Sequence, residues 1–198
     1  MPIECDMPTD ADLVRATCDG DRAAFGRLVD RHLPAVYAAA LRVVCNAATA
    51  EDVAQDTFVR ALERLYLYDM AHPFRNWLVK IATNLALNHL RSARRQRILH
   101  LNLAQRKEED REASLASTDS PAPEEWQHWL RQLDDNHRAA IVLFHFHDMP
   151  YADIAEVLDV PINTVRTYIH RGRKRLRELI TAASNPENGS WSVTMQNG

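Results

Sequence analysis

Residues 149–177 read MPYADIAEVLDVPINTVRTYIHRGRKRLR, and this stretch decides the fold class of the chain. Its first half has apolar residues at helical spacing, the segment Asp159-Val160-Pro161 interrupts them, and its second half is rich in Arg. Two helices joined by a three-residue turn form a helix-turn-helix, whose second helix can enter the major groove of DNA. We expect Asp159 to be left-handed, a conformation that Gly adopts best and that Asp tolerates.

The second helix of this motif has two different faces when successive residues are advanced by about 100°. The first face is apolar or small and comprises Val165, Ile169, Gly172 and Leu176. The second face is polar and basic and comprises Asn163, Arg166, Thr167, His170, Arg171 and Lys174. Arg can bond guanine and Thr can contact thymine methyl groups, so the second face is typical of a base-reading surface. A basic surface helix that enters no groove is the alternative.

The composition predicts an all-α fold built from two small helical domains. The chain has only 5 Gly residues, and no long β-branched segment alternates with polar residues. Helical periodicity covers residues 10–104 and returns over 124–183. Between them, residues 105–123 have the Ser, Pro and acidic composition of a flexible linker. We predict that residues 1–9 and 184–198 are disordered.

The formal net charge of −3 does not exclude binding to nucleic acid, because charge is partitioned along the chain. Acidic residues gather near 51–63 and 108–125, and basic residues gather at 91–107 and 166–177. Local patches of charge, more than the total, set the affinity for phosphates.

Membrane, metal and enzyme classes have little support in the sequence. There is no signal peptide and no run of about 18 apolar residues, so we expect a cytoplasmic protein without a membrane insertion. Cys5, Cys18 and Cys45 are odd in number and widely spaced, which favours a reduced compartment. No Gly-rich phosphate loop, nucleophile–base pair or metal-ligand cluster is visible, so no catalytic residue, metal or cofactor is predicted.

A helix over about 50–65 is predicted to bear an acidic face. Thr49 and Asp52 have the spacing of a capping box at its start. The expected inward residues are Ala54, Phe58, Ala61, Leu62 and Leu65. The expected outward residues are Asp52, Gln55, Asp56, Val59 and Glu63. An apolar side chain ringed by carboxylates suits a basic, partly apolar partner helix, and an ordinary solvated face is the alternative.

A second amphipathic helix is predicted over 77–97. The expected inward residues are Leu78, Ala82, Leu85, Ala86, Leu90 and Ala93. The expected outward residues are Trp77, Lys80, Asn84, Asn88, Arg91 and Arg95. Cations neutralise phosphates, Asn can read base edges, and an aromatic ring can stack on an unpaired base. Packing of the indole, and solvation or compensation of the helix dipole by the Arg residues, are the alternatives.

The segment LYLYDMAHPF, residues 65–74, is predicted to be a loop before this helix. Its Tyr66, Tyr68 and His72 could form a pocket for a flipped base, since stacking offsets the cost of unpairing. Anchoring of the loop by the same side chains is the alternative.

The chain resembles the sigma-70 family of transcription initiation factors, of the extracytoplasmic function (ECF) type. Four segments carry the resemblance: DGDRAAFGRLVDRH (19–32), AEDVAQDTFVRAL (50–62), FRNWLVKIATNLALNHLRS (74–92) and LDDNHRAAIVLFHFHDMPYADIAEVLDVPINTVRTYIHRGRKRLR (133–177). Each segment is moderately specific, and their order and spacing together are strong. Thr83 and Asp159 depart from the Arg and Gly that the family often has at these positions.

The resemblance implies a role for each segment. The acidic helix would dock on the β′ coiled coil of core RNA polymerase through Asp52, Gln55, Asp56 and Phe58 or Val59. The loop and second helix would recognise and melt the −10 promoter element through Tyr66, Tyr68, Trp77, Lys80, Asn84, Asn88, Arg91 and Arg95. The helix-turn-helix would read the −35 element through Asn163, Arg166, Thr167, His170, Arg171 and Lys174. The family also implies the β subunit and an anti-sigma factor as partners, and the anti-sigma factor could hold the chain at the inner membrane face.

A self-sufficient helix-turn-helix repressor or activator is the competing interpretation. Such proteins usually dimerise on palindromic sites, and this chain shows no evident dimerisation helix. An enzyme or metal-binding protein is a third interpretation, which the missing catalytic and ligand motifs disfavour.

Overall fold

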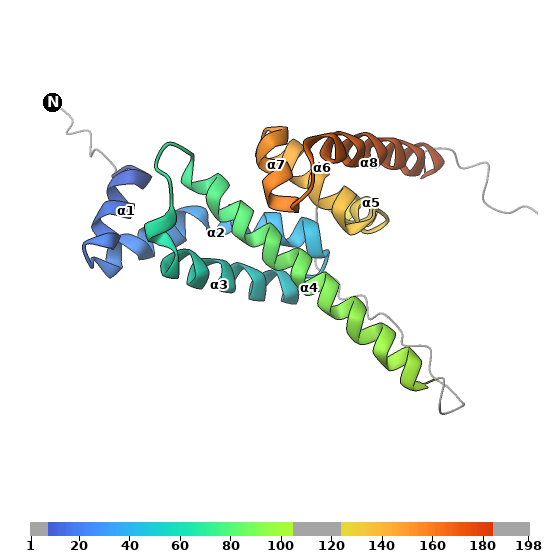
Figure 1. The fold of residues 1–198 in the computed structure, drawn as a ribbon, viewed down its shortest axis with the longest axis horizontal. Helices are drawn as coiled ribbons and strands as arrows, with labels where there is room; N and C mark the ends of the chain where they lie inside the picture. The colour runs from blue at the N-terminus through green and yellow to red at the C-terminus, as the bar shows by residue number, and fades with distance from the viewer. Residues whose placement is uncertain (1–7, 105–123, 184–198) are drawn as a thin grey trace, which may run out of the picture.

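The computed structural model describes residues 8–104 and 124–183, and every regular element among them is helical (Figure 1). The α-helices are α1 (Asp10–Cys18), α2 (Arg22–Val44), α3 (Ala47–Glu63), α4 (Phe74–Ala104), α5 (Glu124–Arg131), α6 (Asp135–His147), α7 (Tyr151–Leu158) and α8 (Ile162–Ala183). A short 3-10 helix, η1 (Leu65–Leu67), lies between α3 and α4. The prediction of an all-α fold is therefore confirmed for the described residues. None of the helices described is long and apolar enough to cross a membrane.

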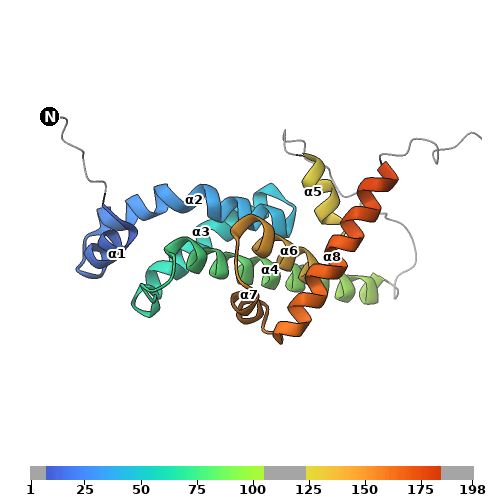
Figure 2. The ribbon, with the colours of Figure 1, turned by 90° about the horizontal axis from the view of Figure 1, so that it is seen from above.

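Helices α1 to α4 form the first half of the molecule. Helix α2 packs along α3 and α4, and α1 packs on α2 (Figures 1 and 2). Polar caps fix two helix starts: Thr9 and Asp12 form a capping box on α1, and the Asp21 carboxylate accepts from two backbone N–H groups of α2. Leu28 of α2 and Phe74 of α4 are fully buried between these helices.

Helices α5 to α8 form the second half, with the helix-turn-helix in α7 and α8. Asp159 joins these two helices at φ 52° and ψ 52°, so the expected left-handed residue is confirmed. Gly172 lies where α8 meets α6, and a Cβ added there would be 2.8 Å from Cγ1 of Ile141. The glycine therefore permits the close approach of the two helices.

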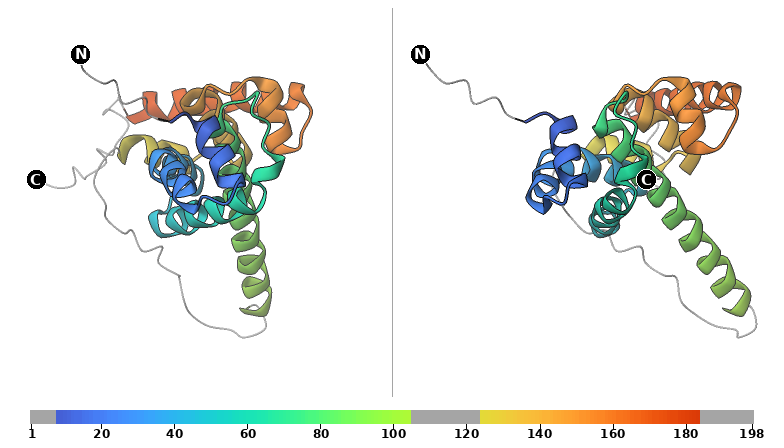
Figure 3. Two further views of the ribbon diagram at one scale, coloured as in Figure 1. Left: turned by 90° about the vertical axis from the view of Figure 1, so that its left-hand side faces the viewer. Right: turned by 60° about the vertical axis from the view of Figure 1, so that its left-hand side comes forward.

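The two halves are packed against one another. Helix α6 contacts α2 and α4, and α7 contacts α4 (Figure 3). One apolar cluster is continuous across the junction, and it includes Val43 and Val79 from the first half and Leu130 and Leu143 from the second. The core thus does not divide at the junction between the halves.

Several helix boundaries differ from the predicted ones. Helix α3 begins at Ala47 because the Asn46 side chain accepts from the Thr49 N–H at 2.9 Å, so the expected capping box of Thr49 and Asp52 is wrong. Helix α4 runs past both predicted ends of 77–97, and no Gly or Pro interrupts it. The predicted linker 105–123, the tail 184–198 and residues 1–7 lie outside the described residues.

Candidate nucleic-acid interface

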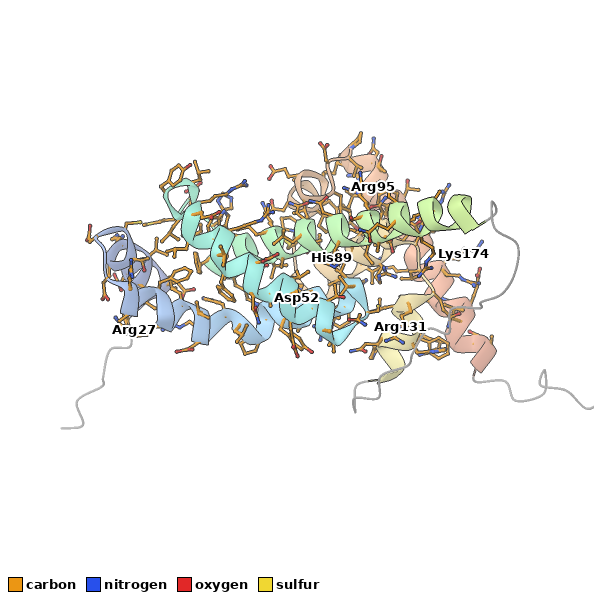
Figure 4. All side chains as sticks on the ribbon, turned by 90° about the horizontal axis from the view of Figure 1, so that it is seen from below. Arg27, Asp52, His89, Arg95, Arg131 and Lys174 are labelled. Carbon is orange, nitrogen blue, oxygen red and sulfur yellow. The ribbon has the colours of Figure 1, made fainter. Side chains whose placement is uncertain are left out.

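The outward face of α8 is the first candidate surface. All six residues predicted for it are exposed: Asn163, Arg166, Thr167, His170, Arg171 and Lys174. The four residues predicted for the inward face are buried: Val165, Ile169, Gly172 and Leu176. Asn163 holds two of its neighbours, since its side-chain oxygen accepts from Arg166 at 3.3 Å and its carbonyl accepts from the Thr167 hydroxyl at 3.0 Å. The helix therefore presents one polar strip to solvent, with Lys174 labelled in Figure 4.

The basic side of α4 is the second candidate surface. Asn84, Asn88, Arg91 and Arg95 are exposed, whereas Trp77 and Lys80 are half-buried. The C-terminal part of α4 extends beyond the other helices, and residues 91–98 are all exposed (Figures 1 and 3; Arg95 is labelled in Figure 4).

This extension corrects one predicted residue and adds two others. Ala93 was expected to face inward and is exposed, because none of the other described helices covers α4 at this point. Arg94 and Arg97 are exposed as well, although the amphipathic pattern assigned them to neither face. The end of α4 is therefore an arm with Arg side chains around it, which suits contact with phosphates.

A pocket of about 250 Å³ lies between the loop after η1 and the start of α4. It is lined by Leu67, Tyr68, Asp69, His72, Pro73, Asn76, Trp77, Lys80, Asp153 and Glu156. The Tyr68 hydroxyl donates to the His72 carbonyl at 2.5 Å, and the Tyr68 ring lies 5.3 Å from that of Trp77. Burial, with the charges of Asp10 and Asp69, raises the pKa of Tyr68.

The flipped-base residues expected from the sequence are thus only partly brought together. Tyr68 and His72 share the pocket, but Tyr66 does not line it and is 77% exposed. Asn76 lines the pocket and was missed, because its position is set by the turn that begins α4 and not by the amphipathic pattern.

The outward face of α3 carries the acidic residues as expected. Asp52, Gln55, Asp56 and Glu63 are exposed, and Asp52 is labelled in Figure 4. Val59 is 57% exposed among them and lines a shallow depression with the side chains of Asp56, Arg60, Glu63 and Arg64.

Two residues of α3 differ from their predicted places. Phe58 was a candidate for direct contact with a partner, but it is only 7% exposed and packs edge-on against Phe25. Phe58 therefore lies beneath the outward face of α3 and not on it. Leu62 was expected inside and is 51% exposed, because it lies at the margin of the stripe that Ala54, Phe58 and Ala61 bury.

An apolar groove of about 540 Å³ on the second half was missed in the sequence. It is lined by Trp126, Ile141, His145, Phe146, Arg173, Leu176, Arg177, Ile180 and Thr181. Trp126 is 50% exposed at its edge. Nε of Arg173 donates to the ring of His145 at 3.0 Å, and burial followed by this cation lowers the pKa of His145. The groove is lined by residues of α5, α6 and α8, so it can be recognised only once the packing of these helices is known.

The structure brings no metal-ligand cluster together in the part of the chain that it describes. Cys18 is exposed, and Cys45 is buried at the end of α2. Burial raises the pKa of the Cys45 thiol, although Arg138 and Arg131 act in the opposite direction.

Two family models match the chain. The sigma-70 region 2 model matches residues 28–96, which include α3 and the basic side of α4. The sigma-70 region 4 model matches residues 124–176, which include the helix-turn-helix. The matches cover more than half of the chain. It belongs to the sigma-70 family.

Individual relatives of this sigma-70 family member are ECF factors. It is 31% identical over 171 residues to the ECF RNA polymerase sigma factor SigW of Bacillus subtilis. The matched residues are 81% of this chain and 91% of SigW. It is 35% identical over 185 residues to the ECF RNA polymerase sigma factor SigE of Mycolicibacterium smegmatis. The matched residues are 91% of this chain and 71% of SigE.

Solved structures of sigma factors agree with this assignment. CnrH in complex with the cytosolic domain of CnrY has a TM-score of 0.61 at 31% identity, covering 87% of this chain and 97% of CnrH. The sigma factor RpoE in complex with the anti-sigma factor NepR from Bartonella quintana has a TM-score of 0.60 at 25% identity, covering 79% of this chain and 96% of RpoE. The resemblance to ECF sigma factors is therefore confirmed.

Proposed function

We propose that this ECF sigma factor directs core RNA polymerase to promoters, reads the −35 and −10 elements, and promotes strand opening. One observation carries the proposal: the polar face of α8 and the basic side of α4 are largely exposed, each within a matched sigma-70 region. Each surface is small, so we expect weak binding from either one alone. Polymerase would hold both at the correct separation and raise their effective concentration.

The −35 element is assigned to α8, lying in the major groove. Arg166 and Arg171 would bond guanine edges, and Thr167 would contact a thymine methyl group. Asn163 orients Arg166 and Thr167 through the hydrogen bonds at the start of the helix. His170 and Lys174 continue the same exposed strip along the groove.

The −10 element is assigned to α4 and the loop before it. Arg91 and Arg95 would neutralise phosphates, and Asn84 and Asn88 would reach base edges. Trp77, Tyr68 and Lys80 border the pocket, which is of the size to receive one unstacked base. Tyr66 would supply a further exposed ring beside the opened strand.

The polymerase contact is assigned to the acidic face of α3. Asp52, Gln55 and Asp56 would steer and bond a basic helix of the β′ coiled coil, and Val59 would fill its apolar centre. Phe58 supports this face from beneath. The apolar groove on α5, α6 and α8 suits a protein partner, and the family's protein partners include the β subunit and an anti-sigma factor.

Control by an anti-sigma factor is part of the proposal. A structural relative at 25% identity is bound to such a factor in its solved structure. The chain would act in the cytoplasm, where polymerase is found, or be held at the inner membrane face by that partner. It has no catalytic residue of its own in this proposal and requires no cofactor.

In vitro transcription tests the function directly. Purified bacterial core RNA polymerase and the full chain are incubated with a fragment library of the source genome, and the transcripts are sequenced. We expect promoter-specific transcripts that fall at least about ten-fold with Asp56→Arg, because a cation now faces the basic coiled coil. Asp19→Arg makes the same change in charge at an exposed acid away from α3. This control should preserve the promoter-specific transcripts.

Two results would contradict the proposal. Transcripts that survive Asp56→Arg would remove the acidic face of α3 from polymerase binding. A palindromic footprint of the protein alone, without transcripts, would identify a conventional repressor or activator.

A further inference from the structure

Helix α1 is tied to α2 by a polar link at its first residue. One carboxylate oxygen of Asp10 accepts from a guanidinium nitrogen of Arg31 at 2.6 Å, and the other lies 2.9 Å from Nε2 of His32. Arg31 also donates to the Pro8 carbonyl at 2.9 Å. The sigma-70 region 2 model begins at residue 28, so Asp10 lies outside the part of the chain that this model matches. The link therefore joins a helix outside the matched region to one within it.

His32 is a buried polar residue whose ring plane is set by this link. Only 7% of the residue is exposed, and burial lowers the pKa of His32 against the opposing charge of Asp10, so the ring is neutral at about pH 7. A carboxylate can only accept, so Nε2 carries the proton and donates it to Asp10. The second side-chain torsion of His is broad, so packing alone fixes the ring plane poorly. The hydrogen bond to Asp10 therefore orients the imidazole.

The oriented imidazole lies against aromatic side chains beneath the candidate base pocket. The ring centroids of His32 and Phe74 are 5.5 Å apart, with the planes steeply inclined at 63°. Phe74 is 1% exposed, and its ring lies 5.0 Å from that of Tyr68 and 5.5 Å from that of Trp77. Tyr68 and Trp77 line the pocket. Phe74 therefore connects His32 to both pocket rings from beneath.

Two further observations place α1 beside the pocket. Helix α1 contacts η1, the short helix that leads into the pocket loop (Figure 1). After burial, the charge of Asp10 is the largest cause that raises the pKa of Tyr68. The polar link is therefore close to the pocket and not in a remote part of the fold.

A stacking pocket gains affinity when its rings are held in place before the base arrives, because less side-chain freedom is then lost on binding. Tyr68 is held at its hydroxyl by the His72 carbonyl. The faces of the Tyr68 and Trp77 rings are held by Phe74, which has no polar atom of its own to fix it. The orientation of Phe74 in turn depends on the imidazole edge that His32 presents to it.

We propose that Asp10 and His32 are positioning residues for the base pocket of the −10 contact. They hold Phe74, and Phe74 holds the two pocket rings in the geometry that stacks on an unstacked base. This inference rests on the function proposed above. Arg31 distinguishes positioning from mere anchoring of α1, because it bonds α1 at two points while the aromatic contact to Phe74 comes from His32.

Binding of single-stranded DNA to the holoenzyme, formed from core polymerase and the full chain, tests the inference. One fluorescein-labelled probe carries the −10 sequence of a promoter found by in vitro transcription. A second probe lacks one base, at the position where its removal weakens wild-type binding most. The ratio of the two dissociation constants, measured by fluorescence anisotropy, gives the contribution of the captured base.

His32→Leu should reduce this ratio about two- to ten-fold, the range expected when an aligned aromatic contact is lost. His32→Gln keeps an N–H donor for Asp10 and should restore most of the ratio. The control Arg31→Met removes both bonds of Arg31 to α1 and should leave the ratio unchanged. General damage to the fold weakens both probes equally and does not move the ratio.

Fluorine NMR of the free chain reads the pocket without polymerase or DNA. The four Trp residues are replaced by 5-fluorotryptophan, and Trp77→Phe assigns one resonance to Trp77. His32→Leu and Asp10→Ala should shift this resonance, because the ring beneath Trp77 is released. Arg31→Met should leave it within the line width.

The inference fails if His32→Leu leaves the Trp77 resonance in place, or leaves the contribution of the captured base as large as in the wild type. It also fails if Arg31→Met has the same effects as His32→Leu, since anchoring of α1 then explains both. A wild-type holoenzyme that binds every probe equally, with a Trp77 resonance that still responds to His32, would reject the −10 assignment of the pocket while leaving the positioning of its rings established.

Discussion

The hydroxyl of Thr83 is buried in α4 and has no hydrogen-bond partner among the described residues. An unpaired buried hydroxyl costs about 1–3 kcal/mol, whereas a methyl group at the same place costs nothing in lost hydrogen bonds. We expect Thr83→Val to raise the free energy of unfolding by about 1 kcal/mol. Urea denaturation followed by circular dichroism measures the change.

Thr57 is the matched control for this prediction. It is equally buried, in α3, but its hydroxyl donates to the Val53 carbonyl at 2.6 Å. Thr57→Val removes this bond and should not stabilise the protein. Equal stabilisation by the two substitutions would show that the missing partner of Thr83 is not the cause.

His147 makes the stability depend on pH. It is 5% exposed at the end of α6, and neither ring nitrogen has a partner among the described residues. Burial, followed by the charges of Arg75 and Arg42, lowers its pKa to about 4, against a smaller opposite effect of Asp148. An unfolded His has a pKa of about 6.5. Between this pKa and the lower pKa of the folded state, the unfolded chain binds a proton at His147 and the folded chain does not. The contribution of neutral His147 is complete above about pH 6.5 and is lost as the pH falls towards 4.

Comparison with His147→Leu isolates this contribution from the carboxylates that titrate in the same range. Between about pH 7.5 and pH 5, we expect the wild type to lose on the order of 2 kcal/mol more stability than the variant. Urea denaturation at the two pH values gives both losses. Equal losses of stability in the wild type and in His147→Leu would mean that His147 is solvated in the folded chain.

Gly172 sets the crossing of α6 and α8. A Cβ at this position would lie 2.8 Å from Cγ1 of Ile141, which is not the free end of a side chain, so the helices must shift to admit it. Overpacking of this kind costs about 1–3 kcal/mol, and the better helix propensity of Ala returns about 1 kcal/mol. We expect Gly172→Ala to lower the free energy of unfolding by about 1 kcal/mol, as measured by urea denaturation.

Gly26 of α2 provides the control, because no atom of the described residues lies within 4 Å of a Cβ built there. Gly26→Ala should gain the helix propensity alone and stabilise the protein by up to about 1 kcal/mol. Opposite signs for the two substitutions are therefore required, and a stabilising Gly172→Ala would contradict the close approach of the helices.

The faces of the helices could largely be predicted from the sequence, but their ends could not. The periodicity of α8 placed all ten assigned residues correctly, because both faces are governed by helix geometry alone. Leu62 and Ala93 were misplaced, because their burial depends on which neighbouring helix reaches them. The start of α3 was missed because Asn46 competes with Thr49 as the cap.

The packing of the two halves was not predictable from periodicity. Lys80 belongs to the solvent side of α4 in the amphipathic pattern, and its pairing with Asp153 joins positions far apart in the chain. Arg138 is one charged residue among the apolar ones of α6, and nothing in its spacing shows that its guanidinium reaches α2. Contacts between distant segments are a property of the folded molecule and leave no local pattern in the sequence.

Arg138 is therefore the residue on which cooperativity between the halves should depend. Its guanidinium bonds the Val43 carbonyl of the first half and the Leu130 and Leu133 carbonyls of the second. Arg138→Met keeps the apolar volume but leaves these buried carbonyls without a donor, which should cost on the order of 3 kcal/mol. We expect calorimetry to show one unfolding transition for the wild type and two separated transitions for this variant, because the halves then unfold independently.

Arg131→Met is the control. Arg131 also bonds a carbonyl at the end of α2, but its side chain is exposed, so water can replace it and the single transition should persist. A single transition in Arg138→Met, lowered but undivided, would mean that the continuous apolar cluster couples the halves without the buried cation.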